Sequence, residues 1–286
     1  MDYNRFSMQK KIRKVLVVSK QGHEKTAEIS GELVRWLEER GIEAVLREND
    51  EHGQRLSGLS GLDLVVVVGG DGTLISVARK VLDGGVPLLG LNMGQVGFLS
   101  EVEVSGWRNR LEKMLADGFE TAERLALEFD VVRGGRNVMS DVAVNDLVVN
   151  RGTLARLIGL GLFLSGEPMG TLRSDGVIVS TPNGSTAYSI SAGGPVLHPA
   201  LEVFSVTPIC PFLHNFRPIV LPGDAELIVE ILEDRAEVYL TQDGQVGFRL
   251  RTGDRLVIRR HEPGPQFVKV PENAYVRKLR KKGVLE

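Results

Sequence analysis

The stretch Leu62-Asp-Leu-Val-Val-Val-Val-Gly-Gly-Asp-Gly-Thr73 decides the fold class of the first part of this 286-residue chain. Its first seven residues are almost continuously apolar, which is typical of a parallel strand that is covered on both faces. Glycines follow at once, and residues 73–82 have the pattern of a helix. A strand that passes through glycines into a helix predicts a βαβ unit and therefore an α/β sheet.

The same alternation of strand and helix continues on both sides of this stretch. A β-branched run at 12–18 precedes a helical pattern at 25–40, which Gly41 is placed to end. Residues 86–91 indicate another strand, and a further helix begins after Ser105. The apolar faces of the two outer helices consist of Ile29, Leu33, Trp36 and Leu37, and of Trp107, Leu111, Met114 and Leu115. The first part of the chain is therefore predicted to form an open, mostly parallel α/β sheet.

The pattern then changes to alternating apolar and charged residues. This alternation occurs at 127–131 and again at 225–231, and a strand-like stretch covers 137–150. Asp243-Gly244 lies between two similar runs, as in a β-hairpin. Residues 122–262 are therefore predicted to form a mainly antiparallel β domain.

Composition and charge exclude several classes of protein. The formal net charge is -2, so no basic field would recruit nucleic acid, and no apolar run approaches the ~20 residues of a membrane helix. The polar residues 1–14 do not form a signal peptide, and we expect a cytoplasmic protein that binds neither nucleic acid nor membrane. The single cysteine, Cys210, is expected to be a small buried residue. The basic run at 277–282 is expected to be a solvated end near a helix terminus.

The glycine-rich turn after the central strand predicts phosphate binding. Glycines let the backbone approach phosphate oxygens, and a helix N-terminus offers unpaired N–H groups and a positive dipole end. The chain has no Gly-Lys dipeptide and no G-x-G-x-x-G motif, which excludes a Walker A loop and argues against an ordinary dinucleotide-binding dehydrogenase. Asp71 would repel phosphate, so it indicates a base for an attacking hydroxyl or a ligand for Mg²⁺. A helix N-cap explains an aspartate there equally well.

Two later features are weaker by themselves. Asn145-Asp146 is an ordinary turn signal. Residues 173–195 are crowded with small hydroxyls and glycines and contain one tyrosine. Such a segment packs poorly as core and suits a surface that hydrogen-bonds a flat, polar ligand, although a turn-rich connection has the same composition.

Together these features resemble the NAD kinase family. Gly69-Gly70-Asp71-Gly72-Thr73, Asn145-Asp146 and Thr181-Pro-Asn-Gly-Ser-Thr-Ala-Tyr188 occur in the family's order, and Asp243-Gly244-Gln245 follows them. Lipid kinases share the first motif and phosphofructokinases have a similar one, whereas the combination is specific and spans nearly the whole chain. The resemblance implies a Rossmann-like N-terminal α/β domain at 1–121, to which 263–286 returns, and a mainly antiparallel β C-terminal domain at 122–262 that binds NAD.

The resemblance also implies an activity and a set of site residues. The activity is phosphoryl transfer from ATP to the 2′-hydroxyl of NAD, with Mg²⁺ carried by the ATP phosphates, in a homo-dimer or homo-tetramer. Asp71 would be the general base. The residues implied to contact the substrates are Gly69, Gly70, Gly72, Thr73, Asn145, Asp146, Arg156, Arg173, Asp175, Thr186, Ala187, Tyr188, Ser189, Ile190, Ser191 and Gln245. Arginines suit phosphate groups, and Tyr188 offers a flat face to a base.

Three positions depart from the family pattern. Gln95 stands where arginine is usual, and Asn183 stands where threonine is usual. Phe212 takes the place of a frequent histidine, so His214 is given no role. Two other functions stay open: a lipid kinase, which the segment 181–195 disfavours, and a non-catalytic pyridine-nucleotide sensor, which the retained Asp71 disfavours.

Overall fold

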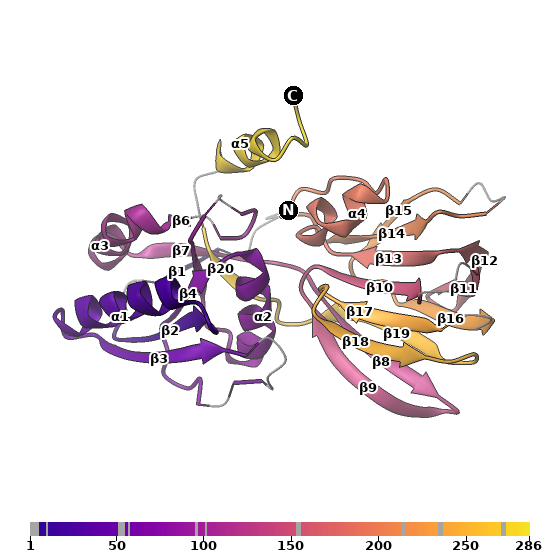
Figure 1. The fold of residues 1–286 in the computed structure, drawn as a ribbon, viewed down its shortest axis with the longest axis horizontal. Helices are drawn as coiled ribbons and strands as arrows, with labels where there is room; N and C mark the ends of the chain where they lie inside the picture. Colours follow the sequence, from indigo (N-terminus) through magenta and orange to yellow (C-terminus); the bar gives the residue numbers. More distant parts are fainter. Residues whose placement is uncertain are drawn as a thin grey trace. The chain divides into compact units, whose positions relative to one another are not determined.

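The computed structural model describes all residues except 1–5, 10, 51–54, 57, 95–96, 101, 153–155, 213–215, 234–236 and 270–272. The chain divides into two compact units (Figure 1). Unit 1 consists of Met1–Arg124 and Pro263–Glu286, and unit 2 consists of Leu125–Glu262. Unit 2 is thus an insertion in unit 1, and the Arg124 N–H donates to the Pro265 carbonyl where the two segments of unit 1 meet.

Unit 1 contains an eight-stranded, mostly parallel sheet in the order β1-β7-β20-β5-β4-β2-β3, with β6 paired to β5. Its strands are β1 (Phe6–Gln9), β2 (Lys14–Lys20), β3 (Glu43–Asn49), β4 (Leu64–Gly69), β5 (Leu88–Asn92), β6 (Val102–Glu103), β7 (Phe119–Glu123) and β20 (Gln266–Val268). Strands β2 to β6 pair in parallel, whereas β7 is antiparallel to both β1 and β20. Strand β3 was not predicted from the sequence, because this edge strand is largely exposed and has no long apolar run.

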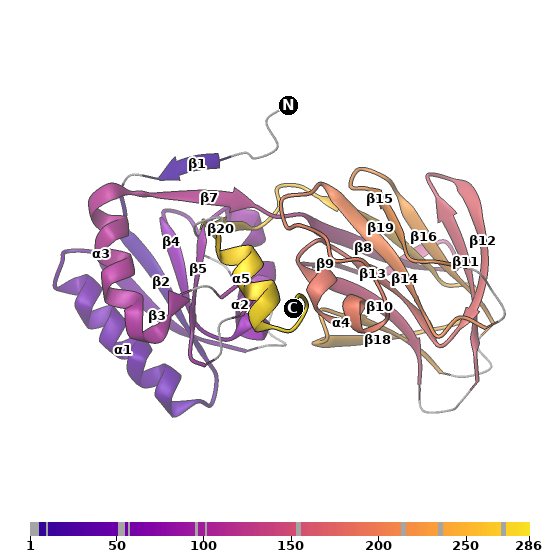
Figure 2. The same ribbon diagram turned by 90° about the horizontal axis from the view of Figure 1, so that it is seen from above.

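Helices cover both faces of this sheet. The helices of unit 1 are α1 (Glu24–Glu38), α2 (Asp71–Val81), α3 (Trp107–Asp117) and α5 (Asn273–Lys281), and its short 3-10 helices are η1 (Leu82–Gly84) and η2 (Val104–Gly106). Helices α1 and α3 lie side by side in Figure 2 and share one apolar cluster with β2, β4 and β5. In that cluster the rings of Trp36 and Trp107 meet edge to face, with centroids 5.3 Å apart. The other face of β4, with Val65 and Val67 fully buried, lies under α2. The helices predicted from the apolar periodicity are therefore confirmed.

Unit 2 contains two six-stranded antiparallel sheets, in the orders β15-β14-β13-β10-β17-β18 and β12-β11-β16-β19-β8-β9. The strands are β8 (Ala126–Arg133), β9 (Arg136–Ala143), β10 (Asp146–Arg151), β11 (Ile158–Leu164), β12 (Glu167–Ser174), β13 (Gly176–Ser180), β14 (Val203–Ile209), β15 (Ile219–Pro222), β16 (Leu227–Glu233), β17 (Val238–Gln242), β18 (Val246–Leu250) and β19 (Arg255–His261). One apolar core, which includes Phe129, Leu147 and Phe204, joins the two sheets. The predicted antiparallel β fold is confirmed.

The strand predicted at 137–150 is in fact two strands in different sheets. Strand β9 belongs to one sheet and β10 to the other, with a break at residues 144 and 145. At the break, the N–H groups of Val144, Asn145 and Asp146 all turn to the carboxylate of Asp243. At this point the chain crosses from one sheet to the other. The Asp243 carboxylate there accepts the N–H groups that would otherwise bond to a neighbouring strand.

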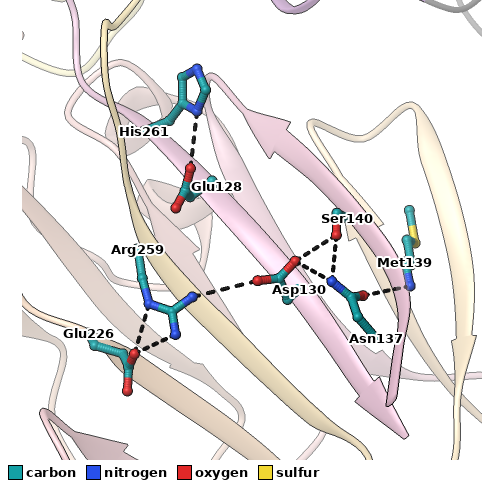
Figure 3. A network of polar contacts seen from close by, with 8 residues as sticks. All are labelled: Glu128, Asp130, Asn137, Met139, Ser140, Glu226, Arg259 and His261. Carbon is teal, nitrogen blue, oxygen red and sulfur yellow. Dashed lines mark hydrogen bonds and ion pairs between the residues drawn. The ribbon is translucent and has the colours of Figure 1, made fainter.

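The outer face of the sheet that contains β8 and β19 is polar (Figure 3). The Arg259 side chain pairs with Glu226 at 2.7 Å and with Asp130 at 3.5 Å, and the Asp130 carboxylate also accepts hydrogen bonds from neighbouring side chains of β9. These ion pairs are partly exposed, so each contributes only about 0–1 kcal/mol. The charged face keeps one side of the sandwich in water, as is common for antiparallel sheets.

Cys210 is exposed, so the expectation of a buried cysteine is wrong. It directly follows β14 and has φ 47. Among the described residues, no helix is both long and apolar enough to cross a membrane.

Phe129 tests the sandwich core, because its side chain is only 2% exposed. Phe129→Ala is expected to lower the free energy of unfolding by about 3–5 kcal/mol, since it removes apolar burial and leaves a cavity. Val138→Ala is the matched control on neighbouring β9, where the side chain is 43% exposed, and it should change stability by less than about 0.5 kcal/mol. Urea unfolding measures both; equal losses would contradict the assigned core.

Candidate active site

The glycine-rich turn joins β4 to α2 at the carboxyl end of a central parallel strand. Gly70 is the N-cap of α2, and Asp71 is the first helical residue. The N-cap explanation of Asp71 is therefore wrong. Gly69 lies close to the buried side chain of Thr73: a Cβ at residue 69 would be only 2.9 Å from it. Gly70 and Gly72 are exposed, so the start of this helix is open to a ligand.

The Asp71 carboxylate is held by the loop that follows β5. Its Oδ2 accepts the Phe98 N–H at 2.7 Å. Its Oδ1 accepts the N–H groups of Leu99 at 3.3 Å and Ser100 at 2.8 Å, and the Ser100 hydroxyl at 2.7 Å. Of the donors among the described residues, three reach Oδ1 and one reaches Oδ2. Since each carboxylate oxygen offers about two lone-pair sites, Oδ2 is the oxygen with room for another proton.

Gly97 is what lets this loop approach the carboxylate. A Cβ at residue 97 would overlap all three carboxyl atoms of Asp71. Gly97, Ser100 and the backbone of 98–100 were not identified as site residues from the sequence, although Gln95 nearby was noted as a departure from the family pattern. No motif signalled their role, because three of the four donors are backbone groups that any residue supplies. Gln95 lies outside the described residues.

In unit 2 the predicted pair Asn145-Asp146 is fixed by the carboxylate of Asp243. Asp243 Oδ1 accepts the N–H groups of Asn145 at 2.7 Å and Asp146 at 3.1 Å, and Oδ2 accepts that of Val144 at 3.2 Å. Asp243 sits in the β17–β18 turn with φ 50, and Gln245 completes the same turn. The family-like Asp243-Gly244-Gln245 thus shapes the backbone around the Asn145-Asp146 pair.

Asp146 is buried, with 4% of its surface exposed. Burial, together with the negative charge of Asp243, raises the pKa of Asp146 to about 7. The side chain therefore changes between a hydrogen-bond donor and an ionised acceptor near neutral pH.

The hydroxyl-rich segment packs on the outer face of the sheet formed by β10, β13 and β14, through η3 (Gly184–Thr186) and α4 (Tyr188–Ser191). Ser185 Oγ donates to the Pro182 carbonyl at 2.7 Å and accepts the Leu197 N–H at 3.0 Å. Ser189 Oγ lies 3.3 Å from Thr207 Oγ1. Both serines are fully buried, so the interpretation of the whole segment as surface is wrong. These hydroxyls satisfy the protein's own polar groups.

Other predicted residues of this segment do face solvent. Tyr188 is 45% exposed, and Ala187 and Ser191 are exposed beside it, while Thr186 and Ile190 are partly exposed. Asn183 is 8% exposed, and among the described residues neither atom of its side-chain amide has a hydrogen-bond partner. The Asn145 carbonyl oxygen packs against Gly184, where an added Cβ would overlap it. The segment and the Asn145-Asp146 pair are therefore brought together.

Arg173 and Asp175 do not lie beside the Asn145-Asp146 pair. Asp146 pairs with Ser180 at one end of β10, whereas Arg151 and Asp175 are linked at the other end, five residues or about 16 Å away. Asp175 forms an ion pair with Arg151, a residue that the sequence analysis missed, at 2.6 Å. Arg173 is exposed on β12, and Arg156 is exposed after an undescribed segment. His214 lies outside the described residues.

Comparison with known proteins identifies the family. Residues 57–119 match the model of the ATP-NAD kinase N-terminal domain, and residues 144–270 match the model of the ATP-NAD kinase C-terminal domain. The chain is 50% identical to the NAD kinase of Nitratidesulfovibrio vulgaris (strain Miyazaki F) over 96% of its own length and 98% of that protein. The chain belongs to the ATP-NAD kinase family. It is therefore a kinase that phosphorylates NAD to NADP with ATP.

Solved structures agree with this assignment. An NAD kinase from Archaeoglobus fulgidus, in complex with ATP, superposes with a TM-score of 0.75 and 26% identity over 96% of this chain and all of that one. Yeast NADH kinase complexed with NADH superposes with a TM-score of 0.85 over 97% of this chain and 92% of that one; at 24% identity this likeness concerns the fold alone.

Gly97→Ala tests the contact between the loop and Asp71. The new methyl group must displace the carboxylate or the loop, so kcat for NADP formation is expected to fall about tenfold or more. Gly94→Ala is the matched control in the same loop, because an added Cβ there meets open space. Steady-state rates of both variants decide the point; equal rates would show that the contact is irrelevant to turnover.

The raised pKa of Asp146 predicts a pH-dependent stability. Between about pH 4 and pH 7 the unfolded chain ionises this carboxyl and the folded chain does not, so the contribution of Asp146 to wild-type stability falls as pH rises through this window. Asp146→Asn cannot ionise and avoids the loss. Its stability relative to wild type should therefore rise by roughly 2–4 kcal/mol between pH 4 and pH 8.

Urea unfolding at several pH values measures this difference. Exposed Asp224→Asn serves as the control for replacing a surface aspartate. A difference that does not depend on pH for Asp146→Asn would mean that Asp146 is ionised normally in the folded protein.

Proposed function

We propose that this enzyme transfers the γ-phosphoryl group of Mg-ATP to the 2′-hydroxyl of the adenosine ribose of NAD, with Asp71 as the general base. The observation that carries this proposal is a carboxylate at an open, glycine-lined helix N-terminus, aimed by three backbone N–H groups and one hydroxyl. A residue that only stabilised the helix would bond to the helix itself, whereas this side chain bonds to a separate loop.

Phosphate binding falls to residues 69–73. The exposed backbone at Gly70 and Gly72 and the first N–H groups of α2 suit a phosphate group, which the helix dipole also favours. Within the described residues no three His, Cys, Asp or Glu side chains group as a metal site. In this proposal Mg²⁺ enters as part of the Mg-ATP substrate, where it would neutralise charge that builds up on the phosphates.

Asp71 takes the proton. As the 2′-oxygen forms its bond to the γ-phosphorus, the bond from that phosphorus to the β–γ bridging oxygen breaks, and the hydroxyl proton moves to Asp71 Oδ2. ADP and NADP result. Oδ1 is occupied by its three donors, so the loop both orients the carboxylate and selects the oxygen that acts.

NAD recognition falls to groups of unit 2. Tyr188 presents an exposed ring on which a base can stack. Asn145, Asp146 and Gln245, with the backbone of 186–191, supply donors and acceptors for the riboses and the adenine. Arg156 and Arg173 are exposed cations that suit phosphate oxygens. Asp175 belongs with Arg173 to a second subsite, which a molecule as long as a dinucleotide can also reach.

The assembly is proposed to be a homo-dimer or homo-tetramer. The edge strand β15 exposes Val220, and Leu201 and Phe212 are exposed apolar residues of the same unit. An edge strand with apolar side chains is suited to pairing with another copy.

Asp71→Asn is expected to lower kcat about 10²- to 10⁴-fold while the Kd for NAD stays within a few-fold, because an amide preserves the shape but cannot accept the proton. NADP formation is followed with an NADP-specific dehydrogenase, and NAD binding by calorimetry. Exposed Asp117→Asn, in α3 of the same unit, is the control and should keep wild-type turnover. A near-normal rate for Asp71→Asn would overturn the assigned base.

A further inference from the structure

The basic residues of α5 are not all solvated, contrary to the sequence expectation. Lys278 is 8% exposed, and its Nζ donates to the Phe98 carbonyl oxygen at 2.9 Å. Its neighbour Leu279 is also buried, with 6% of its surface exposed. By contrast, Lys281 and Lys282 are exposed. A lysine is rarely buried so completely without a specific partner, so the partner is informative.

Its partner belongs to the loop that holds Asp71. The carbonyl of Phe98 and the N–H of Leu99 are the two ends of a single peptide group. That carbonyl faces Lys278 Nζ, and that N–H donates to Asp71 Oδ1 at 3.3 Å. In a planar trans peptide these two bonds point in opposite directions. The peptide group therefore lies between the ammonium of α5 and the carboxylate of α2.

This arrangement has an electrostatic and a geometric consequence. A cation at the carbonyl polarises the peptide and strengthens the donor at its other end, because linked hydrogen bonds reinforce each other in a poorly solvated site. Fixing the carbonyl also fixes the plane of the peptide and so the direction of the Leu99 N–H. The Leu99 bond is the longest of the four to Asp71, so it depends most on such support.

We propose that Lys278 is a positioning residue for Asp71, which acts through the peptide group between Phe98 and Leu99. It does not touch the substrates; it keeps the loop in the orientation that directs Asp71 Oδ2 at the reacting hydroxyl. The proposal rests on the role of Asp71 given above. It extends the catalytic apparatus to a segment that lies 207 positions after Asp71 in the sequence.

The test is a double-mutant cycle in the full chain. Lys278→Met keeps the apolar stem and removes the ammonium, so kcat should fall about tenfold to a hundredfold, with the KM for NAD changed less than about twofold. Lys278→Arg restores a cationic donor and should recover most of the rate. Lys281→Met, an exposed lysine of the same helix, is the matched control and should match the wild type.

The decisive variant combines Lys278→Met with Asp71→Asn. If Lys278 acts through Asp71, adding Lys278→Met to the Asp71→Asn variant should change kcat less than about twofold. The slow turnover of these variants is measured by NADP cycling. A further loss of about tenfold in that background would overturn the proposal, because it would show an effect independent of Asp71. An unchanged kcat for Lys278→Met alone would also overturn it.

Amide hydrogen exchange separates positioning from a general loss of folding. In Lys278→Met the Leu99 amide should lose protection while amides of the central strand β4 keep theirs, and Lys281→Met should change neither. Loss of protection throughout unit 1 would refute a positioning role. The two proposals fail in different ways. A near-normal kcat for Asp71→Asn would contradict the role of Asp71 as the base. A low kcat for Asp71→Asn together with a near-normal kcat for Lys278→Met would contradict only the role of Lys278.

Discussion

The hydrogen bonds between the Asp71 carboxylate and residues 98–100 are the constraint on which unit 1 depends. They tie the start of α2 to the loop after β5, and they require a glycine at 97 and an unobstructed turn at 69–73. Four donors compensate the negative charge of the Asp71 carboxylate at this helix N-terminus before any substrate arrives. This compensation is compatible with the proposed pairing of a phosphate site and a base.

Unit 2 uses the same device in a different setting. The Asp243 carboxylate collects three consecutive N–H groups and so turns the chain from one sheet to the other at Asn145. Buried hydroxyls then attach residues 181–197 to the Val144 carbonyl, through Thr181, and to Thr207 of β14, through Ser189. The composition of this region suggested that its polar side chains bind a ligand. The buried ones instead hydrogen-bond the protein's own groups and hold the backbone in place. Exposed groups such as Tyr188 are the ones that we propose to contact the nucleotide.

The sequence predicted the architecture well, because hydrophobic periodicity directly records which face of an element is buried. Motifs that depend on local backbone geometry led to the proposed roles of Asp71 and Asn145. The contacts of Lys278 and Ser100 could not be predicted in this way, because they join segments far apart in the chain. The same limit explains the error at Ser185 and Ser189: composition alone does not tell whether a hydroxyl bonds inward or to a ligand.

The insertion of unit 2 between β7 and β20 has a consequence for biosynthesis. Strand β20 lies inside the sheet of unit 1, between β7 and β5, so this sheet stays split until residues 266–268 have left the ribosome. All of unit 2 has been translated by then and is free to fold, because domains commonly fold as their sequence emerges. The loop that holds Asp71 gains its contact with Lys278 only when α5 follows. A nascent chain thus completes the proposed NAD-binding unit before it completes the surroundings of the proposed base.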